Sequence, residues 1–332
     1  MPSVLITGAN GFIGSHLCDA FHERGYEVYA LVRTTSNLKF LRHSQARLVY
    51  GDLKEIDSIS LPELVDVIVH AAARVSDNAS MEECRSDILE ITMKLCEWAL
   101  QHCRRLKRFV YISSALTLGY CSDHISEQNP GHSADYVPYN YMKKRTENVL
   151  RDTYAKRGLP LVIMRPGDVY GPRDRTSCEL MLKAAERNQL IIVGRGDKTF
   201  GFCYPANLCQ AVLAAVQTER AVGQAYTVTN SVLPTWRQFF SALREAVGKP
   251  QRIYIPVPLA IGVGLFMGVL KRLIPGFSPS LNYYRLRRIT CQTTYDISKT
   301  IAELGYRPDD DFSAQVRATI EWYQNERKEP ER

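Results

Sequence analysis

The chain has 332 residues, of which 45% are hydrophobic and 23% are charged, and its formal net charge is +7. The length and the apolar content predict a sizeable core in one large domain or two closely associated ones. Lysines and arginines are spread along the chain, which argues against a nucleic-acid-binding arm. We therefore expect a small-molecule substrate and no nucleic-acid partner.

The nine cysteines are scattered without a Cys-x-x-Cys pair, and the seven histidines are isolated from them and from one another. This pattern predicts free thiols in a reducing compartment, and neither a disulfide framework nor a zinc site. The N-terminal segment starting at Val4 has no basic region before its apolar run, so it does not resemble a signal peptide. We expect a cytoplasmic protein without a bound metal.

Short apolar runs alternate with helical patterns through the first half of the chain. The runs lack clean polar alternation, which is typical of strands buried on both faces of a parallel sheet. The pattern predicts an α/β fold, a Rossmann-type doubly wound parallel sheet. The predicted strands are 4–7, 28–32, 48–51, 65–73, 108–114 and 159–166, and the predicted helices are 15–24, 87–102 and 139–156.

The pattern loosens after Arg165, where loops, short helices and prolines alternate. A short helix is expected at 178–188, and the run YTVTN at 226–230 is a candidate for one more strand of the sheet. We predict a smaller, mostly C-terminal substrate-binding domain. The division is 1–172 for the Rossmann domain with 201–230 returning to it, 173–200 and 231–325 for the substrate-binding domain, and 326–332 for a frayed tail.

The longest uncharged run covers residues 253–270, and its length lies at the threshold for a membrane helix. Pro256 and Pro258 leave only about three turns for a helix before Lys271. We favour a buried helix that lines an apolar pocket. A peripheral membrane contact is the alternative, and a transmembrane span is not expected.

A glycine turn follows the first predicted strand. In Gly8-Ala9-Asn10-Gly11-Phe12-Ile13-Gly14, Gly8 allows a sharp turn, Gly11 a close approach to a pyrophosphate, and Gly14 close packing of helix on strand. The helix N-terminus then offers free N–H groups to the phosphates. We expect Gly8, Asn10, Gly11, Phe12, Ile13 and Gly14 to bind a dinucleotide.

The end of the second strand distinguishes the two nicotinamide dinucleotides. NAD is favoured by an acidic residue there, but this chain has Arg33 followed by Thr34, Thr35 and Ser36. A guanidinium with nearby hydroxyls suits a 2′-phosphate. NADP(H) is therefore the favoured cofactor, with NAD(H) as the alternative in which Arg33 only stacks on adenine or lies on the surface.

Three tyrosine–lysine pairs stand four residues apart, at Tyr50–Lys54, Tyr139–Lys143 and Tyr295–Lys299. On a helix such a spacing places both side chains on one face, where an ammonium could lower the pKa of a phenol. The spacing alone does not choose among the three pairs.

TGANGFIGSHL closely resembles the N-terminal motif of the extended short-chain dehydrogenase/reductase superfamily, also known as the NAD-dependent epimerase/dehydratase family. RPGDVYGPRD at 165–174 resembles its next landmark, so the resemblance is firm to about Pro172 and looser beyond. It implies cofactor contacts from Asp52 and Leu53 to adenine, from Ala71, Ala72 and Ala73, and from the backbone near Pro166–Val169 to nicotinamide.

The resemblance also selects one tyrosine. The family places a serine at the end of the fifth strand and a Tyr-x-x-x-Lys about 25 residues later, which matches Ser114, Tyr139 and Lys143. It implies that Tyr139 exchanges a proton with the substrate, that Lys143 bonds the nicotinamide ribose, and that Ser114 bonds the substrate oxygen. We expect Tyr50 in a buried strand and Tyr295 outside the site.

Departures from the family pattern bear on the substrate and the active site. Phe200 and Gly201 stand where nucleotide-sugar enzymes usually carry Arg-Asp, while YPANL at 204–208 resembles the 3β-hydroxysteroid dehydrogenase and dihydroflavonol reductase-like subgroup. Asp87 replaces a supporting asparagine, and Met142 replaces a serine.

We therefore predict an NADP-dependent enzyme that moves a hydride between nicotinamide and a hydroxyl or ketone of a fairly apolar molecule. Alternatives are a nucleotide-sugar epimerase or reductase, and a non-catalytic NADP-binding sensor. The resemblance implies a homodimer built from the helices at 87–102 and 139–156.

Overall fold

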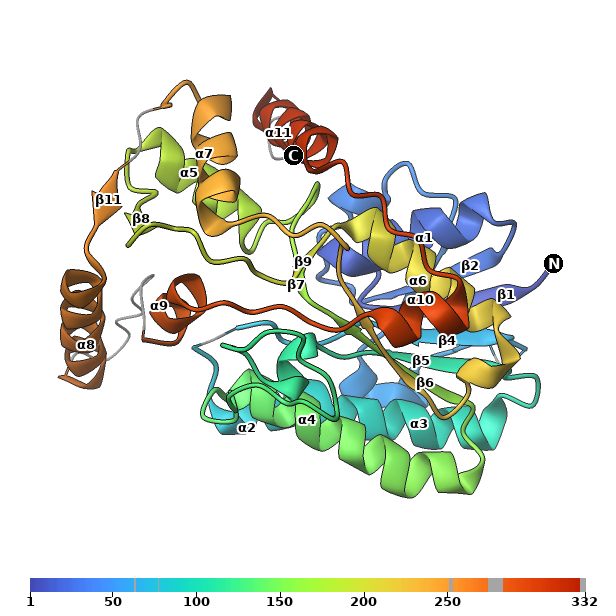
Figure 1. Ribbon diagram of the computed structural model, residues 1–332. Coiled ribbons are helices and arrows are strands. Elements are labelled where there is room, and N and C mark those ends of the chain that lie inside the picture. The colour runs from blue at the N-terminus through green and yellow to red at the C-terminus, as the bar shows by residue number, and fades with distance from the viewer. Residues whose placement is uncertain (63, 77, 251–252, 274–282, 329–332) are drawn as a thin grey trace.

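The computed structural model describes all residues except 63, 77, 251–252, 274–282 and 329–332 (Figure 1). A seven-stranded sheet in which every neighbouring pair is parallel forms its centre. The predicted doubly wound sheet is thus confirmed. Its strands, in spatial order, are β10 (Ala225–Val228), β6 (Leu161–Pro166), β5 (Arg108–Ile112), β4 (Val67–His70), β1 (Ser3–Thr7), β2 (Glu27–Val32) and β3 (Arg47–Tyr50).

Helices cover both faces of the sheet, so successive residues of the central strands are buried on opposite sides. Leu5 packs into one core and Ile6 into the other, which explains why the strands read as continuous apolar runs. Figure 1 shows α1 and α6 on one face and α3 and α4 on the other. These helices are α1 (Phe12–Glu23), α6 (Pro205–Gln217), α3 (Ile91–His102) and α4 (Pro138–Val149).

The chain order reverses beside β1. Chain connections run from β1 to β2 on one side and from β3 to β4 on the other, so the carboxyl ends of β1 and β4 form a topological switch point, which is where open α/β sheets bind ligands. The predicted cofactor residues follow β1, β2, β3 and β4 at this edge. The fold alone therefore gathers segments that are distant in sequence.

Two predicted elements differ from the observed ones. The helix expected at 87–102 begins at Met81, because Ser80 and Glu83 form a capping box at α2 (Met81–Cys84), and a π turn (Arg85–Glu90) joins it to α3. Tyr50 is not buried: it ends the edge strand β3, where 51% of the residue is exposed.

A smaller unit packs beside the sheet around an aromatic core that includes Phe200, Trp236 and Phe239. It contains α5 (Cys178–Glu186), β8 (Ile192–Val193), α7 (Trp236–Ala246), β11 (Tyr254–Ile255), α8 (Val257–Leu273), α9 (Tyr283–Thr290) and α11 (Phe312–Lys328), while β7 (Asp168–Val169) pairs with β9 (Phe202–Cys203).

Two parts of the C-terminal region depart from the predicted division. Leu304 and Tyr306, around α10 (Ser298–Leu304), pack into the core of the large sheet although 231–325 was assigned to the substrate-binding domain. The predicted frayed tail is wrong for 326–328, which belong to α11, and Glu326 forms ion pairs with Lys39 and Arg175. Residues 329–332 lie outside the described part.

The expectation of free thiols is wrong for one pair, because Cys121 and Cys291 form a disulfide. Backbone hydrogen bonds support the same junction, with Ile125 N–H donating to the carbonyl of Thr294 at 2.9 Å. These contacts join a loop after β5 to the segment after α9. The seven other cysteines are buried and form no disulfide among the described residues.

The apolar run at 253–270 does not form the buried helix that we favoured. In its described part, Ala260 is buried, whereas Leu259, Leu265 and Phe266 of α8 are exposed. Within the described residues, no helix has both the length and the apolar character needed to cross a membrane.

Candidate active site

The glycine turn between β1 and α1 has the shape that a dinucleotide needs. Gly8 has a φ of +66°, and a Cβ at Gly14 would lie 2.1 Å from the carbonyl oxygen of Gly8. Gly11 instead is exposed, and among the described residues a Cβ there would meet only that carbonyl oxygen, at 3.1 Å. The glycines thus let the chain pack tightly on one side and leave it accessible on the other.

The first turn of α1 is free to receive an anion. Its N-cap, Gly11, provides no side-chain cap, and the turn contains no acidic residue. The N–H groups of this first turn and the positive end of the helix dipole therefore lie at the carboxyl end of β1. These features fit the pyrophosphate of a nicotinamide dinucleotide.

The residues predicted to hold the adenosine end lie at the same sheet edge. Arg33 follows β2 and is exposed, and its guanidinium has no ion-pair partner among the described residues. Asn10 donates from Nδ2 to the carbonyl of Asn37 at 3.4 Å, which connects the glycine turn to the loop after Arg33. Asp52 caps a 3-10 turn by accepting from the N–H of Lys54 at 2.9 Å.

The alanines after β4 are fastened to β1. Ala71 N–H donates to the Thr7 carbonyl and Ala72 N–H donates to Thr7 Oγ1, both at 3.3 Å. A Cβ at Gly8 would come within 2.8 Å of the Ala72 backbone. Pro166 and Val169 continue from β6 at the same edge of the sheet.

The predicted catalytic residues come from β5 and α4. Ser114 lies two residues after β5 and caps a 3-10 turn (Ala115–Leu118), accepting from the N–H of Leu116 at 3.3 Å. Pro138 opens α4, so Tyr139 and Lys143 stand one turn apart on it. Tyr139 is half-buried.

Lys143 ties the helix to the strand. Only 3% of the residue is exposed, and Nζ donates to the carbonyl oxygen of Ile112 at 2.6 Å. Nζ also lies 4.6 Å from the centre of the Tyr111 ring. These contacts hold α4 against the end of β5, where Ser114 follows.

Burial controls the charge of Lys143. Removal from water lowers the pKa of Lys143 to about 7, although the nearby Glu147 carboxylate acts in the opposite direction. The neighbouring His70 ring bonds Thr7 and Thr92, and burial, followed by the charge of Lys143, lowers the pKa of His70 to about 3. His70 is therefore neutral at pH 7, whereas Lys143 is close to the midpoint of its titration there, with the ammonium and amine forms in similar amounts.

Lys143→Met tests this charge state through stability. The unfolded chain holds the lysine proton up to about pH 10, whereas the folded protein releases it near 7. Between these values the unfolded state binds more protons, so the free energy of unfolding of the wild type rises with pH relative to that of the variant. We expect a relative rise of up to about 1.4 kcal/mol per pH unit in urea unfolding. Parallel pH profiles would contradict it.

A buried ion pair joins β6 to α4 next to Ser113. Arg165 of β6 grips both carboxylate oxygens of Glu147 of α4, with Nε 3.0 Å from each and Nη2 2.5 Å from Oε2. Ser113 Oγ donates to Glu147 at 2.5 Å, and Thr117 Oγ1 donates at 3.2 Å. Burial opposes the charge of Arg165, but its hydrogen bond to Glu147 outweighs this and raises the pKa of Arg165.

In the other two tyrosine–lysine pairs each lysine is engaged elsewhere. Lys54 pairs with Asp87 at 2.6 Å, and the Tyr50 beside it is exposed. Lys299 donates to Gln224 at 2.8 Å, while the hydroxyl of the buried Tyr295 donates to the carbonyl of Gly119 at 3.0 Å. Neither pair has the arrangement of Tyr139 and Lys143, which lie at the start of a helix that packs on the end of β5, where Ser114 follows.

Comparison with known proteins identifies the family. The NAD dependent epimerase/dehydratase family matches residues 4–229. The chain belongs to this family. The predicted resemblance to the extended short-chain dehydrogenase/reductase superfamily, nearest its 3β-hydroxysteroid dehydrogenase-like subgroup, is thereby confirmed.

Curated relatives span the whole length of the chain. It is 28% identical to sterol demethylase protein B of Methylococcus capsulatus, over 97% of this chain and 98% of that one. It is 24% identical to the decarboxylating sterol-4-alpha-carboxylate 3-dehydrogenase of Candida albicans, over 97% of both chains. UDP-glucuronic acid 4-epimerase of Bacillus cereus, solved with UDP-glucuronic acid and NAD, shares the fold with a TM-score of 0.73 at 24% identity, over 97% and 99% of the two chains.

Asp87, which replaces the family's usual asparagine, belongs to a charged cluster on the π turn. Its carboxylate lies 2.6 Å from Lys54 Nζ and 2.6 Å from Arg74 Nε. Burial opposes ionisation, but the hydrogen bonds from these two cations prevail and lower the pKa of Asp87. Asp87 thus connects the loops after β3 and β4 as a charged carboxylate, and does not act as a neutral replacement for the asparagine amide.

Contacts from α9 reach the candidate site, and the sequence prediction missed them. Asn140, directly after Tyr139, donates from Nδ2 to the Tyr284 hydroxyl at 3.1 Å. Arg288 of α9 forms an ion pair with Asp168 of β7. No local signal could have revealed either contact, because the partners are 120 or more residues apart.

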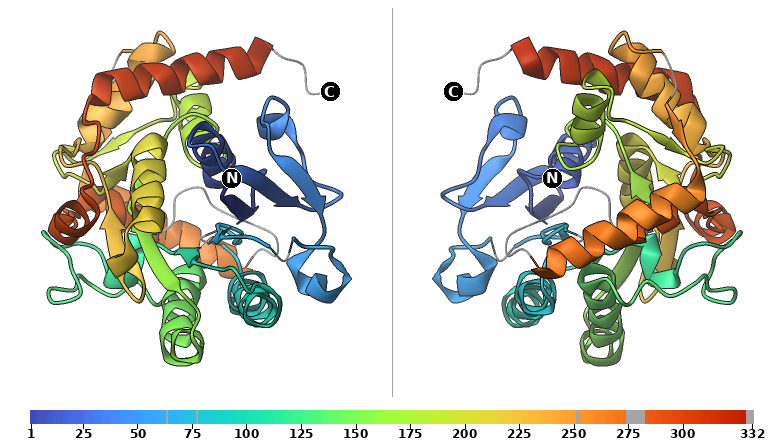
Figure 2. Two further views of the ribbon diagram at one scale, coloured as in Figure 1. Left: turned by 90° about the vertical axis from the view of Figure 1, so that its right-hand side faces the viewer. Right: turned by 90° about the vertical axis from the view of Figure 1, so that its left-hand side faces the viewer.

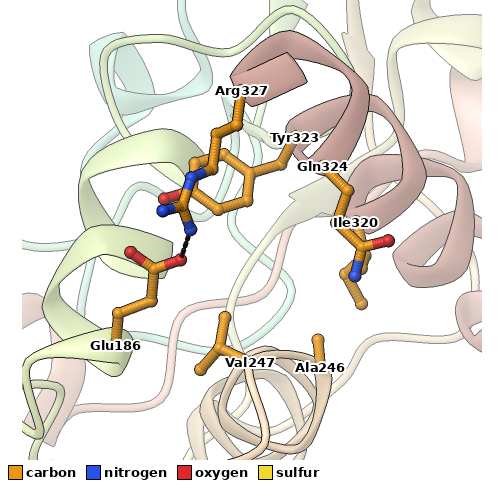
Figure 3. Close-up of a pocket in the computed structure, with 7 residues that line it drawn as sticks. All are labelled: Glu186, Ala246, Val247, Ile320, Tyr323, Gln324 and Arg327. Carbon is orange, nitrogen blue, oxygen red and sulfur yellow. Dashed lines mark hydrogen bonds and ion pairs between the residues drawn. The ribbon is translucent and has the colours of Figure 1, made fainter.

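Two surface pockets lie outside the predicted cofactor residues. One of about 240 Å³ is enclosed by α5, α7 and α11, and the Arg327 guanidinium points across it to Glu186 (Figure 3). Another of about 360 Å³ is lined by Glu147, Arg165 and part of the 3-10 turn that Ser114 caps. Neither is lined by Tyr139 or Lys143, so neither replaces the carboxyl edge of the sheet as the candidate active site.

Proposed function

We propose that this protein is an NADP-dependent oxidoreductase that interconverts a ketone and a hydroxyl group on a fairly apolar small molecule. One observation carries the proposal: a buried lysine, Lys143, joins the helix that bears Tyr139 to the strand end that bears Ser114. This junction and the glycine turn lie at the same carboxyl edge of the sheet, which supports hydride chemistry rather than binding alone.

Each of the three residues has a distinct role in the proposal. The nicotinamide supplies or accepts the hydride when it is bound. Tyr139 gives its phenolic proton to the ketone oxygen, or takes it back in the oxidation direction. Ser114 donates a hydrogen bond to the same oxygen, and the ammonium form of Lys143 favours the phenolate of Tyr139 by its charge.

The preference for NADP(H) rests on Arg33. An exposed guanidinium follows β2 and has no ion-pair partner in the part of the chain that the structure describes. No acidic residue stands there to accept hydrogen bonds from ribose hydroxyls. A charge-assisted hydrogen bond to a 2′-phosphate has the geometry that arginine provides.

Arg33→Ala will weaken NADPH binding roughly tenfold to a hundredfold, because a hydrogen bond to a charged group is lost. NADH binding will change little. A fluorescence titration of both cofactors measures this. Arg47→Ala is the matched control. Arg47 is also exposed, but it lies at the amino end of β3, whereas Arg33 follows the carboxyl end of β2. Equal affinity of the wild type for NADPH and NADH would overturn the preference.

An apolar substrate is supported by the segment where nucleotide-sugar enzymes carry their arginine. Phe200 faces inward, stacked on Trp236 with ring centres 4.0 Å apart, and 1% of it is exposed. Arg195 and Lys198 of the same segment are exposed. The names of two full-length relatives refer to sterols, and we propose the same substrate class for this chain.

A further inference from the structure

The helix α8 turns its small residues toward the protein and its bulky apolar residues toward the outside. Small residues face the protein: Ala260 is fully buried, and a Cβ at Gly264 would lie 2.3 Å from Leu286 Cδ1 of α9. Bulky apolar residues face outward instead, with Leu265 56% exposed and Phe266 63% exposed. A surface helix of a globular protein normally shows the reverse arrangement. We define the outer face of α8 as Leu259, Val263, Leu265 and Phe266.

This face lies at the periphery of the molecule. Figure 1 shows α8 at the edge opposite the N-terminus, and the right-hand view of Figure 2 shows it crossing the near side. Among the described elements, α9 provides its main contact. The four outward side chains are therefore available to a partner. Exposed apolar residues that are scattered singly need no partner to explain them, but these four share one helix face.

The charge of the surrounding sequence indicates the kind of partner. Residues 246–295 contain no aspartate or glutamate and seven lysines or arginines. The chain has 42 basic and 35 acidic residues, so without these seven the basic residues would equal the acidic ones. By sequence, the whole positive excess of the protein therefore belongs to the segment that contains α8, and one of its seven cations, Arg288, pairs with Asp168.

Aromatic residues flank the same helix. Tyr254 precedes α8 and Tyr283 opens α9, and each is 46% exposed. Tyrosines with an apolar ring and a polar hydroxyl are enriched where protein meets the boundary between lipid and water. An apolar helix face with basic residues and tyrosines before and after it in the sequence has the composition of an interfacial membrane anchor.

We propose that the outer face of α8 docks the protein on the surface of a bilayer rich in anionic lipids. Leu259, Leu265 and Phe266 enter the acyl boundary, and the basic excess of 246–295 is attracted to the headgroups. A second copy of the chain fits less well. In a two-fold interface this segment would face itself, bringing together two positive excesses without an acid in either.

A flotation assay with the full-length protein tests the proposal. The probes are vesicles of phosphatidylcholine alone and vesicles with about 30% phosphatidylglycerol added. We expect the wild type to float with the anionic vesicles, less with the neutral ones, and less at high salt. The double variant Leu265→Ser/Phe266→Ser will reduce the vesicle-bound fraction roughly tenfold or more, since two apolar side chains no longer enter the lipid.

A matched control removes two exposed apolar residues elsewhere. Leu180→Ser/Val232→Ser changes side chains that are 55% and 64% exposed, away from α8, and will float like the wild type. Circular dichroism verifies the fold of each protein, and Leu259→Ser/Val263→Ser serves as a second test on the same face. The proposal is overturned if the wild type ignores anionic vesicles, if the α8 variants float equally well, or if sedimentation shows a dimer that they dissociate without any vesicle binding.

Discussion

Tyr139→Phe will lower the rate of NADPH-dependent ketone reduction by roughly 10²–10⁴-fold, because the substrate oxygen loses its proton donor. Phenylalanine keeps the ring that packs with Ile88 and Met142, so the fold and the affinity for NADPH will be retained. Initial rates with an apolar ketone and a cofactor titration on the same preparation measure both quantities.

Tyr50→Phe is the matched control for this substitution. It also removes a hydroxyl from a tyrosine four residues before a lysine, but Tyr50 is exposed at the sheet edge and its Lys54 pairs with Asp87. We expect wild-type rates from it. If Tyr139→Phe retained activity within a few-fold of the wild type, Tyr139 would not be the proton donor and the proposed mechanism would be wrong.

Arg165→Leu will destabilise the folded protein by about 3–5 kcal/mol, because it leaves the carboxylate of Glu147 buried without its cation. Only 6% of Arg165 and 3% of Glu147 are exposed, so water cannot replace the lost partner at little cost. Urea unfolding followed by circular dichroism measures the change.

The same substitution at Arg157 separates burial from charge. Arg157 grips Glu97 with two nitrogens, as Arg165 grips Glu147, but the two side chains are 46% and 40% exposed. An exposed pair contributes at most about 1 kcal/mol, so Arg157→Leu will shift the unfolding curve only slightly. Similar losses in the two variants would show that burial of the Arg165–Glu147 pair does not strengthen the junction of β6 and α4.

The part of the fold that could be predicted is the part encoded locally. Gly8, Gly11 and Gly14 form a turn whose spacing has a direct steric meaning, and the β-branched runs reveal strands buried on both faces. The start of the helix before Asp87 was missed because the prediction followed apolar periodicity, although Ser80 and Glu83 carry a capping signal.

What could not be predicted depends on contacts distant in sequence. The Cys121–Cys291 disulfide joins residues 170 positions apart, and spacing alone gives no reason to pair two of nine cysteines. The contact of Asn140 with Tyr284 likewise depends on where α9 docks. The apolar character of α8 was visible, but its direction was not, because periodicity does not reveal which face meets the protein.

The most direct test of the proposed chemistry follows the hydride itself. The protein is incubated with NADPH carrying deuterium at one or the other C4 position and with an apolar cyclic ketone, and the alcohol is analysed by mass spectrometry. The proposal predicts one deuterium on the carbinol carbon from only one of the two labelled cofactors. Absence of transfer to any apolar ketone, together with epimerisation of a UDP-sugar, would contradict it and assign the site to nucleotide-sugar chemistry.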